Sequence, residues 1–127
     1  MQELERYLHI TTDGVISVVE FSHDVFNEKI HELCNCEVFE CVALPHYGDL
    51  LMIVDESGKI TDPPKRINPV ASMLYPGTLI GDFIVGDVLL GKYGYYDGEP
   101  DITGLYEPAL NYFYKFLTDL KESYYGK

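Results

Sequence analysis

The chain has 127 residues and a formal net charge of −12, from 21 acidic and 9 basic residues. This length is that of one ordinary domain, and 46% hydrophobic with 13% aromatic residues is typical of a globular protein. Such an acidic chain repels phosphate backbones, so direct nucleic-acid binding is not expected. No apolar run approaches the roughly 20 residues of a membrane helix, and the N-terminus lacks the features of a secretory signal, so we expect a cytoplasmic protein with no membrane partner.

The acidic residues are unevenly distributed along the chain. Residues 1–60 contain 12 acidic and 3 basic residues, hence a charge of −9, which leaves −3 for the remainder. An acidic face attracts basic protein surfaces. Our candidates for such a protein-binding face are Glu28, Glu32, Glu37, Glu40, Asp55 and Glu56. Acidic residues on a surface can also act only to keep a protein soluble. The sequence leaves open whether this acidity binds a partner or only solubilises the chain.

The N-terminal segment predicts a β-hairpin. Residues 7–12 and 15–21 favour strands, and both are rich in β-branched and aromatic side chains. Asp13 and Gly14 lie between them, and this dipeptide is typical of a type I′ turn, in which both central residues have positive φ.

A helix is expected directly after the hairpin. Phe26, Ile30 and Leu33 recur at the i, i+4, i+7 spacing of one helical face. This pattern predicts a helix over residues 23–33, with charged residues on its other side.

Two strands follow, over residues 37–44 and 50–54. The second is almost wholly apolar, which is typical of a strand in the middle of a sheet. Because only a short loop connects them, we expect them to be antiparallel neighbours.

The central part of the chain alternates between proline, glycine and apolar residues. Residues 70–74 are expected to form a short helix with Pro69 in its first turn. Residues 78–90 predict either two short strands or one strand that bends at Gly81 and Gly86.

The C-terminal part is expected to consist of a loop and a helix. Residues 91–104 are rich in glycine, tyrosine and aspartate, which favours a loop for recognition or a loop fixed to the core by its aromatic rings. Beyond it, Leu110 and Leu117 share one face of a helix that begins near Pro108.

The fold class that follows is α+β in a single domain, residues 1–127. We expect a mostly antiparallel sheet of about five to six strands. One helix in the N-terminal half, a short central helix and a C-terminal helix are expected to pack on one face of this sheet.

The three cysteines offer a weak case for a metal. His31, Cys34, Cys36 and Cys41 are four candidate ligands within eleven residues. The spacing between the first two cysteines is shorter than zinc sites use, and no second ligand pair follows. We therefore expect no metal and no cofactor, with Cys41 in the core of a strand and the other two cysteines as reduced thiols.

No catalytic motif is apparent, and we do not expect an enzyme. The four histidines lie in no serine-hydrolase or zincin motif. Gly77, Gly81 and Gly86 are not followed by the Gly-Lys-Ser/Thr of a phosphate loop. Asp82 and Asp87 lie beside these glycines, where aspartate usually belongs to a turn.

One small basic segment is the candidate for an anion or nucleotide site. Lys65 and Arg66 form the only adjacent basic pair, and Asn68 follows on a backbone stiffened by proline. Tyr95 and Tyr96 could stack on a nucleotide base. Alternatively, the two basic residues only neutralise nearby acid.

Five segments resemble the family of domains of unknown function named DUF3846, which occurs in phages, plasmids and conjugative elements. They are ITTDG (10–14), ALP (43–45), VDESGK (54–59), NPVAS (68–72) and GDFIVGDVL (81–89). The likeness covers residues 7–90 and leaves out the tyrosine-rich loop and the C-terminal helix, 91–127. It implies a mobile-element setting in a bacterial host and no established activity. Small acidic proteins in that setting often look like inhibitors of host defence.

Three functions are therefore considered. The first is a non-enzymatic inhibitor of a host defence system, whose acidic face occupies a basic surface on a host protein. The second is a sponge that sequesters a nucleotide immune signal in the basic and aromatic pocket. The third is a structural or regulatory domain whose acidity is only solubilising. Association of copies of the chain is left open by the sequence.

Overall fold

A computed structural model describes residues 3–125. The helices and strands in chain order are β1 (Leu4–Ile10), β2 (Ile16–Ser22), α1 (Phe26–Cys34), β3 (Phe39–Ala43), β4 (Leu50–Asp55), α2 (Pro69–Leu74), β5 (Val88–Tyr96), β6 (Glu99–Thr103) and α3 (Ala109–Tyr125). The 3₁₀ helices are η1 (His23–Val25), η2 (Pro45–Tyr47) and η3 (Pro76–Ile80). In the described part of the chain, no helix combines the length and the apolar character needed to span a membrane.

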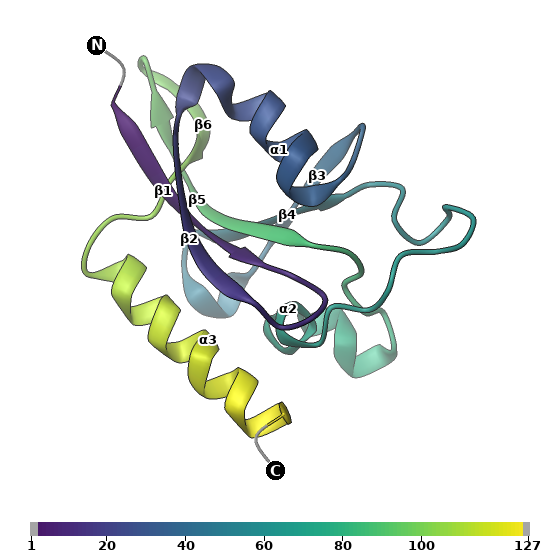
Figure 1. The fold of residues 1–127 in the computed structure, drawn as a ribbon. Helices are drawn as coiled ribbons and strands as arrows, with labels where there is room; N and C mark the ends of the chain where they lie inside the picture. Colours follow the sequence, from purple (N-terminus) through teal and green to yellow (C-terminus); the bar gives the residue numbers. More distant parts are fainter. Residues whose placement is uncertain (1–2, 126–127) are drawn as a thin grey trace.

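The strands form one six-stranded sheet in which every pair is antiparallel (Figure 1). Its order is β2-β1-β5-β4-β3, and β6 pairs with the second half of β5. The α+β class and the antiparallel sheet are thus confirmed, as is the interior position of the apolar strand β4. Strands β2 and β3 are the two outer strands of this path.

The helices are divided between the two faces of the sheet, so the expectation that they pack on one face is wrong for α1. Figure 1 shows α1 on one side of the strands and α3 on the other. The apolar cluster under α1 includes Tyr7, Phe26, Ile30, Leu51 and Leu89. The cluster on the opposite face includes Leu8, Met52, Leu90, Val70, Leu74, Leu110 and Leu117.

The physical reason lies in the two central strands. All six residues of β4 are buried, and successive side chains of a strand point to opposite faces. A strand that is apolar at nearly every position exposes hydrophobic surface unless both of its faces are covered. One helix therefore covers one face, and the other two cover the opposite face.

The first hairpin forms as expected, with Ile10 opposite Ile16, but its turn differs. Gly14 has a φ of +84°, whereas Asp13 is not in the positive-φ region. The Gly14 N–H donates to the Thr11 carbonyl at 3.0 Å. The Thr11 N–H also donates to the Val15 carbonyl, so residues 12–14 form a three-residue loop. This loop, with its left-handed glycine, replaces the predicted type I′ turn.

Residues 78–87 do not form the predicted strand. They contain the end of η3 and an irregular segment, and β5 begins only at Val88. Gly81 and Gly86 have φ of +85° and +79°, a left-handed conformation that a strand does not contain. The glycines thus end the regular structure rather than bend it.

Residues 91–104, expected to be a loop, form most of the hairpin β5–β6. Asp97 and Gly98 both have positive φ, at +52° and +80°, as a type I′ turn requires. Gly91 is needed for close strand packing, because a Cβ there would lie 2.8 Å from the Thr103 carbonyl oxygen. The prediction of a loop was wrong because it relied on the glycines. Tyrosine favours strands, and this preference was not taken into account.

The three predicted helices are confirmed. Of the expected stripe on α1, Phe26 and Ile30 are buried and Leu33 is half-buried. Pro69 begins α2, and Leu110 and Leu117 are the buried residues of α3. The outcome follows from periodic apolar spacing, which is a strong local signal.

Candidate functional site

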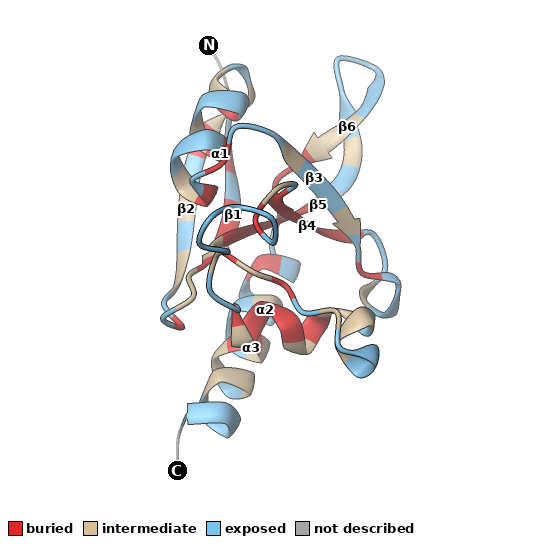
Figure 2. Cartoon of the chain, turned by 90° about the vertical axis from the view of Figure 1, so that its right-hand side faces the viewer, coloured by how far each residue is buried: buried red, intermediate tan, exposed pale blue. Residues whose placement is uncertain are grey.

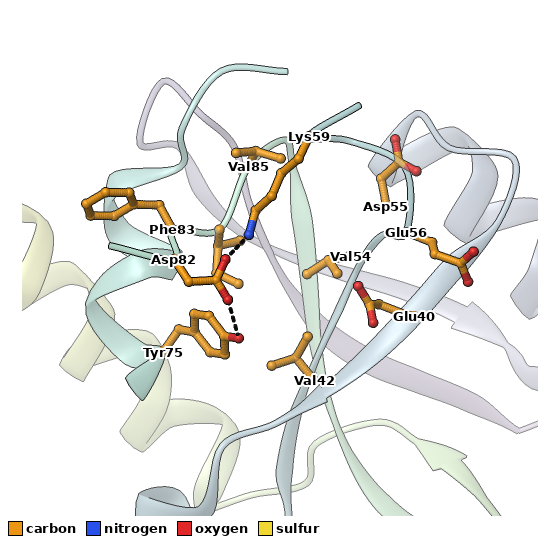
Figure 3. Close-up of a pocket in the computed structure, with 11 residues that line it drawn as sticks. Glu40, Val42, Val54, Asp55, Glu56, Lys59, Tyr75, Asp82, Phe83 and Val85 are labelled. Carbon is orange, nitrogen blue, oxygen red and sulfur yellow. Dashed lines mark hydrogen bonds and ion pairs between the residues drawn. The ribbon is translucent and has the colours of Figure 1, made fainter. Parts of the chain in front are cut away.

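An acidic cleft lies between strands β3 and β4 on one side and the segment 75–85 on the other (Figure 3). Its lining residues are Glu40, Val42, Val54, Asp55, Glu56, Lys59, Tyr75, Asp82, Phe83, Ile84 and Val85. The volume of about 130 Å³ is close to that of a cavity that holds a benzene-sized group. The cleft therefore has room for one side chain of a partner, with apolar surface below and carboxylates around it.

Glu40 and Glu56 form the strand side of this cleft. Glu40 lies opposite Val54, and the Glu56 N–H donates to the Val38 carbonyl, so the two glutamates are diagonal neighbours on one face of the sheet. Both are exposed, and neither carboxylate has a hydrogen-bond or ion-pair partner among residues 3–125. Two like charges placed side by side repel each other, so this arrangement does not serve stability.

The opposite wall carries a satisfied carboxylate. The Tyr75 hydroxyl donates to Asp82 Oδ2 at 3.0 Å, and the Lys59 ammonium group contacts Oδ1 of the same carboxylate (Figure 3). These two hydrogen bonds, first that of Lys59, hold the pKa of Asp82 below its usual value. The hydrogen bond to Asp82 in turn raises the pKa of Tyr75. The negative charge available to a ligand is therefore on Glu40 and Glu56.

Strand β3 has an open edge beside the cleft. Within residues 3–125 it pairs only with β4, and Figure 2 shows it at the surface. The Leu44 N–H donates to the Leu50 carbonyl, and the Val38 carbonyl accepts from the Glu56 N–H. The backbone N–H and C=O groups of the even-numbered residues of β3 therefore point toward β4. The backbone N–H and C=O groups of Phe39, Cys41 and Ala43 therefore point away from the sheet.

The six predicted acidic residues do not share one face. Glu28 and Glu32 are exposed on α1, which covers the sheet face opposite to the cleft, and Glu37 lies in the loop that follows α1. Of these six residues, Glu40 and Glu56 come together as carboxylates without a partner among residues 3–125. The acidic half of the sequence is thus spread over several surfaces rather than gathered in one.

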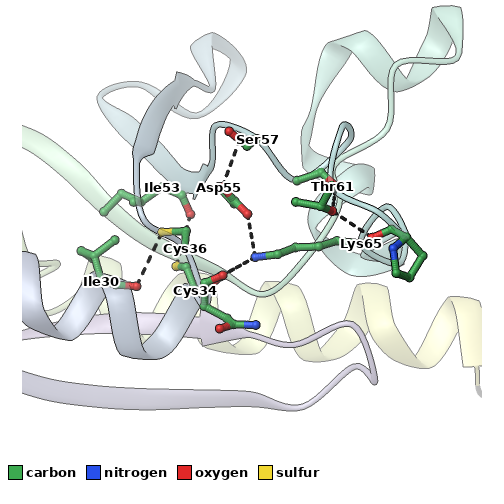
Figure 4. A network of polar contacts seen from close by, with 11 residues as sticks. Ile30, Cys34, Cys36, Ile53, Asp55, Ser57, Thr61 and Lys65 are labelled. Atoms are coloured by element: carbon green, nitrogen blue, oxygen red, sulfur yellow. Dashed lines mark hydrogen bonds and ion pairs between the residues drawn. The ribbon is translucent and has the colours of Figure 1, made fainter.

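Asp55 is the clearest departure from the predicted acidic face, because it is buried and paired. Its carboxylate lies 2.7 Å from the Lys65 ammonium and accepts a hydrogen bond from the Ser57 N–H (Figure 4). Lys65 also donates to the Cys34 carbonyl, at the C-terminal end of α1. This network fixes the loop before α2 to α1. The positive charge of Lys65 is neutralised by Asp55 inside the protein.

The predicted nucleotide site is not assembled. Arg66 pairs with Asp13 at 3.0 Å, and Asn68 is fully buried, where it caps α2 through the Ala71 N–H and donates to the Ile10 and Gly86 carbonyls. Gly86 lies against Lys65, two residues before β5 begins.

The two tyrosines of that prediction lie at the other end of β5. Tyr95 and Tyr96 are about 25 Å along the strand from its first residue, at 3.3 Å per residue. Tyr96 stacks on His23, with ring centroids 3.7 Å apart, whereas Tyr95 is one of the most exposed tyrosines, at 74%. The aromatic residues therefore form a surface hairpin that is separate from Lys65 and Arg66.

The cysteines are distributed differently from the prediction. Cys41 is exposed rather than in the core, and its strand β3 is an outer strand of the sheet. Cys34 and Cys36 are buried, and burial raises the pKa of Cys34 to about 12. In the described part of the chain, no three His, Cys, Asp or Glu side chains are grouped closely enough to hold a metal ion.

Several residues of the cleft were missed by the sequence analysis. Tyr75, Lys59 and Val42 had no assigned role, and Asp82 was interpreted as a turn residue. The spacing of Glu40 and Val42 along a predicted strand could have placed both on one face. The meeting of β3 with the segment 75–85 had no local signal, because it depends on how α2 packs.

A family model described as a domain of unknown function (DUF3846) matches residues 5–116. The match extends beyond the predicted range 7–90, so the hairpin β5–β6 and the first part of α3 belong to the shared region. Comparison with curated proteins and with solved structures gave no match. Because the matched region covers most of the 127 residues, the chain belongs to the DUF3846 family.

Proposed function

We propose that this chain is a non-enzymatic binding protein whose acidic cleft receives a basic side chain of a partner protein. The observation that carries the proposal is the pair Glu40, on β3, and Glu56, directly after β4. Both are exposed carboxylates without a counter-charge among residues 3–125. Keeping like charges together costs stability, and a bound cation would offset that cost.

The chemistry of the cleft favours arginine or lysine as the group that enters. Val42 and Val54 provide an apolar surface between the two walls, as Figure 3 shows. Arginine and lysine carry an aliphatic stem that packs on such a surface, with a charged head that reaches the carboxylates. The guanidinium of arginine fits best, because it can bond to both glutamates at once.

The biological role that we propose is inhibition of a host defence protein in the cytoplasm of a bacterial cell, with the chain encoded by a phage or other mobile element. Support comes from the resemblance that implies a mobile-element setting and from the net charge of −12, which favours association with basic proteins. Nucleases and other nucleic-acid-binding defence proteins carry basic surfaces of this kind.

The experiment combines a functional and a binding measurement. The chain is expressed in bacterial strains that each carry one defence system, and phage plating efficiency is measured with wild type and with Glu40→Gln/Glu56→Gln. We expect wild type to restore plating in at least one strain and the variant to fail. The charge-matched control, Glu28→Gln/Glu32→Gln, removes the same charge from α1 and should retain activity.

The defence protein identified in this way is then purified, and its affinity is measured between low and high salt. We expect binding to weaken steeply with salt for wild type, because surface charges are screened within about 10 Å at 0.1 M. A complex that is insensitive both to salt and to loss of the two glutamates would overturn the acidic-cleft proposal.

A thermal-shift panel of cyclic and ADP-ribose-type nucleotides addresses the sponge hypothesis. We expect no stabilisation, since Lys65 is paired with Asp55 and Arg66 with Asp13. A shift that Arg66→Gln abolishes would favour the nucleotide function instead.

A further inference from the structure

We infer that the partner binds as an extended basic segment that adds a strand to the open edge of β3 and places a basic side chain in the acidic cleft. This inference rests on the proposed function and specifies the form of the ligand. It joins two features that lie side by side, an unpaired strand edge and an acidic cleft lined by the same strand.

The backbone of β3 supplies the first half of the recognition. Phe39, Cys41 and Ala43 point their N–H and C=O groups away from β4, and no hydrogen-bond partner for these groups lies among residues 3–125. An unpaired edge of this kind is a template for another extended chain. Main-chain hydrogen bonds would give affinity, and pockets for alternate side chains would give selectivity.

The side chains of β3 supply the second half. Glu40 and Val42 project to the face that carries the cleft, whereas Phe39 projects to the α1 face, where it contacts Phe26. In an added strand, every second residue would project to the cleft face. A lysine or arginine at that position would meet Glu40 and Glu56, so the preferred sequence alternates basic with apolar or small residues.

The other strand edges are less suited to a basic segment. Strand β6 contains Pro100, which has no N–H to donate. On β2, the carboxylate of Glu20 is already paired with Arg6 at 3.0 Å. Of these three edges, the edge of β3 is thus the one that combines open backbone groups with unpaired carboxylates in a neighbouring cleft.

The test uses a short synthetic peptide in which lysine and valine alternate, titrated into the ¹⁵N-labelled full chain. We expect shifts of the amide signals of β3, including Cys41, and slower hydrogen exchange at these amides on binding. A matched peptide with the same side chains but N-methylated at alternate residues keeps the charge and removes backbone donors. It should bind about tenfold or more weakly, since each hydrogen bond contributes about 1 kcal/mol.

Two variants test the edge from the side of the protein. Cys41→Pro removes an outward N–H without removing a bond to β4, so it should abolish peptide binding while the fold is retained. Cys41→Ala is the matched control and should bind like wild type. If Cys41→Pro does not fold, the N-methylated peptide and protection of the wild-type Cys41 thiol from alkylation still test the edge.

The outcomes separate this inference from the proposed function. Peptide binding that requires Glu40 and Glu56 but is unaffected by N-methylation would overturn strand addition and leave the acidic cleft intact. Binding that survives Glu40→Gln/Glu56→Gln but fails with the N-methylated peptide would support the edge and overturn the cleft. No binding of either peptide, at concentrations where the defence partner binds, would overturn strand addition.

Discussion

Two neighbouring residues of the chain, Asp55 and Glu56, show how differently two polar regions of this protein use their charge. Asp55 is buried and paired with Lys65, in a network that connects the loop before α2 to α1. Glu56 is exposed and lies beside Glu40 with no counter-charge among residues 3–125. We call these regions the buried network (Asp55, Lys65 and the Cys34 carbonyl) and the acidic cleft.

The difference follows from the geometry of a strand. Successive side chains at the end of β4 point to opposite faces of the sheet, so one carboxylate meets the lysine and the next faces the cleft. A buried charge needs a counter-charge or hydrogen bonds, because it has lost contact with water. An exposed charge is solvated and needs no partner in the protein. Charge in the buried network is thus neutralised inside the protein, whereas the charge of Glu40 and Glu56 is exposed at the acidic cleft.

The largest expected effect is that of Lys65→Met. The side chain of Asp55 is only 6% exposed, and this change leaves its charge buried without a counter-charge, with only the Ser57 N–H as a hydrogen-bond donor. We expect the free energy of unfolding to fall by about 3 kcal/mol, measured by urea denaturation. The double variant Lys65→Met/Asp55→Asn should recover part of the loss. A single variant as stable as wild type would mean that the pair does not stabilise the fold.

The next largest effect is expected for Asn68→Ala. The change leaves the Ile10 and Gly86 carbonyls and the Ala71 N–H without their partner in a fully buried site. Chemical denaturation should show a loss of about 2 kcal/mol. Asn68→Asp keeps the cap acceptor and loses both donors. If it matched wild type, the two carbonyl contacts would contribute nothing.

Glu40→Gln/Glu56→Gln should have a small effect on stability in the opposite direction. Removing two neighbouring like charges relieves repulsion, so we expect unchanged or slightly higher stability, within about 0.5 kcal/mol, whereas the proposed function predicts that the double variant loses binding. Thermal denaturation at low and high salt measures it. A marked destabilisation would indicate that these glutamates stabilise the fold, as the pairing of Asp55 is expected to do.

The smallest effect concerns the titration of Asp82. Tyr75→Phe removes one of the two hydrogen bonds that lower its pKa, so the pKa should rise toward its usual value, as followed by NMR of the carboxyl carbon. Because folding lowers this pKa, the contribution of Asp82 to stability is present above its usual pKa and is lost as the pH falls through the lowered one. Lys59→Met should raise the pKa further. An unchanged pKa in both variants would contradict the hydrogen bonds.

Much of the fold could be predicted because its signals are local. Apolar residues at helical spacing identified α1 and α3, and the position of Pro69 identified the start of α2. The errors arose where one dipeptide or glycine pattern fits several backbones. Asp13-Gly14 and Asp97-Gly98 look alike in sequence, yet only the second pair adopts positive φ at both residues.

The candidate site was predicted only in part. Glu40 and Glu56 were among the predicted acidic candidates, but they were grouped with Asp55 and with Glu28 and Glu32 of α1. Lys65 and Asn68 were considered as candidates for an anion site, with neutralisation of nearby acid as the alternative for Lys65. Which polar groups are paired inside the protein depends on contacts between distant segments, such as that of Asn68 with Ile10. Such contacts have no signal in local sequence spacing.

The sequence by itself thus determined the strongly acidic charge, the α+β class, the helices and most strands, because these depend on composition and on periods of a few residues. Only the tertiary structure decided that α1 covers the opposite face from α2 and α3. It also decided that, within residues 3–125, β3 has an open edge and Asp55 is paired while Glu40 and Glu56 are not. The reason is that burial and ion pairing are properties of segments brought together by the packing of both faces of the sheet.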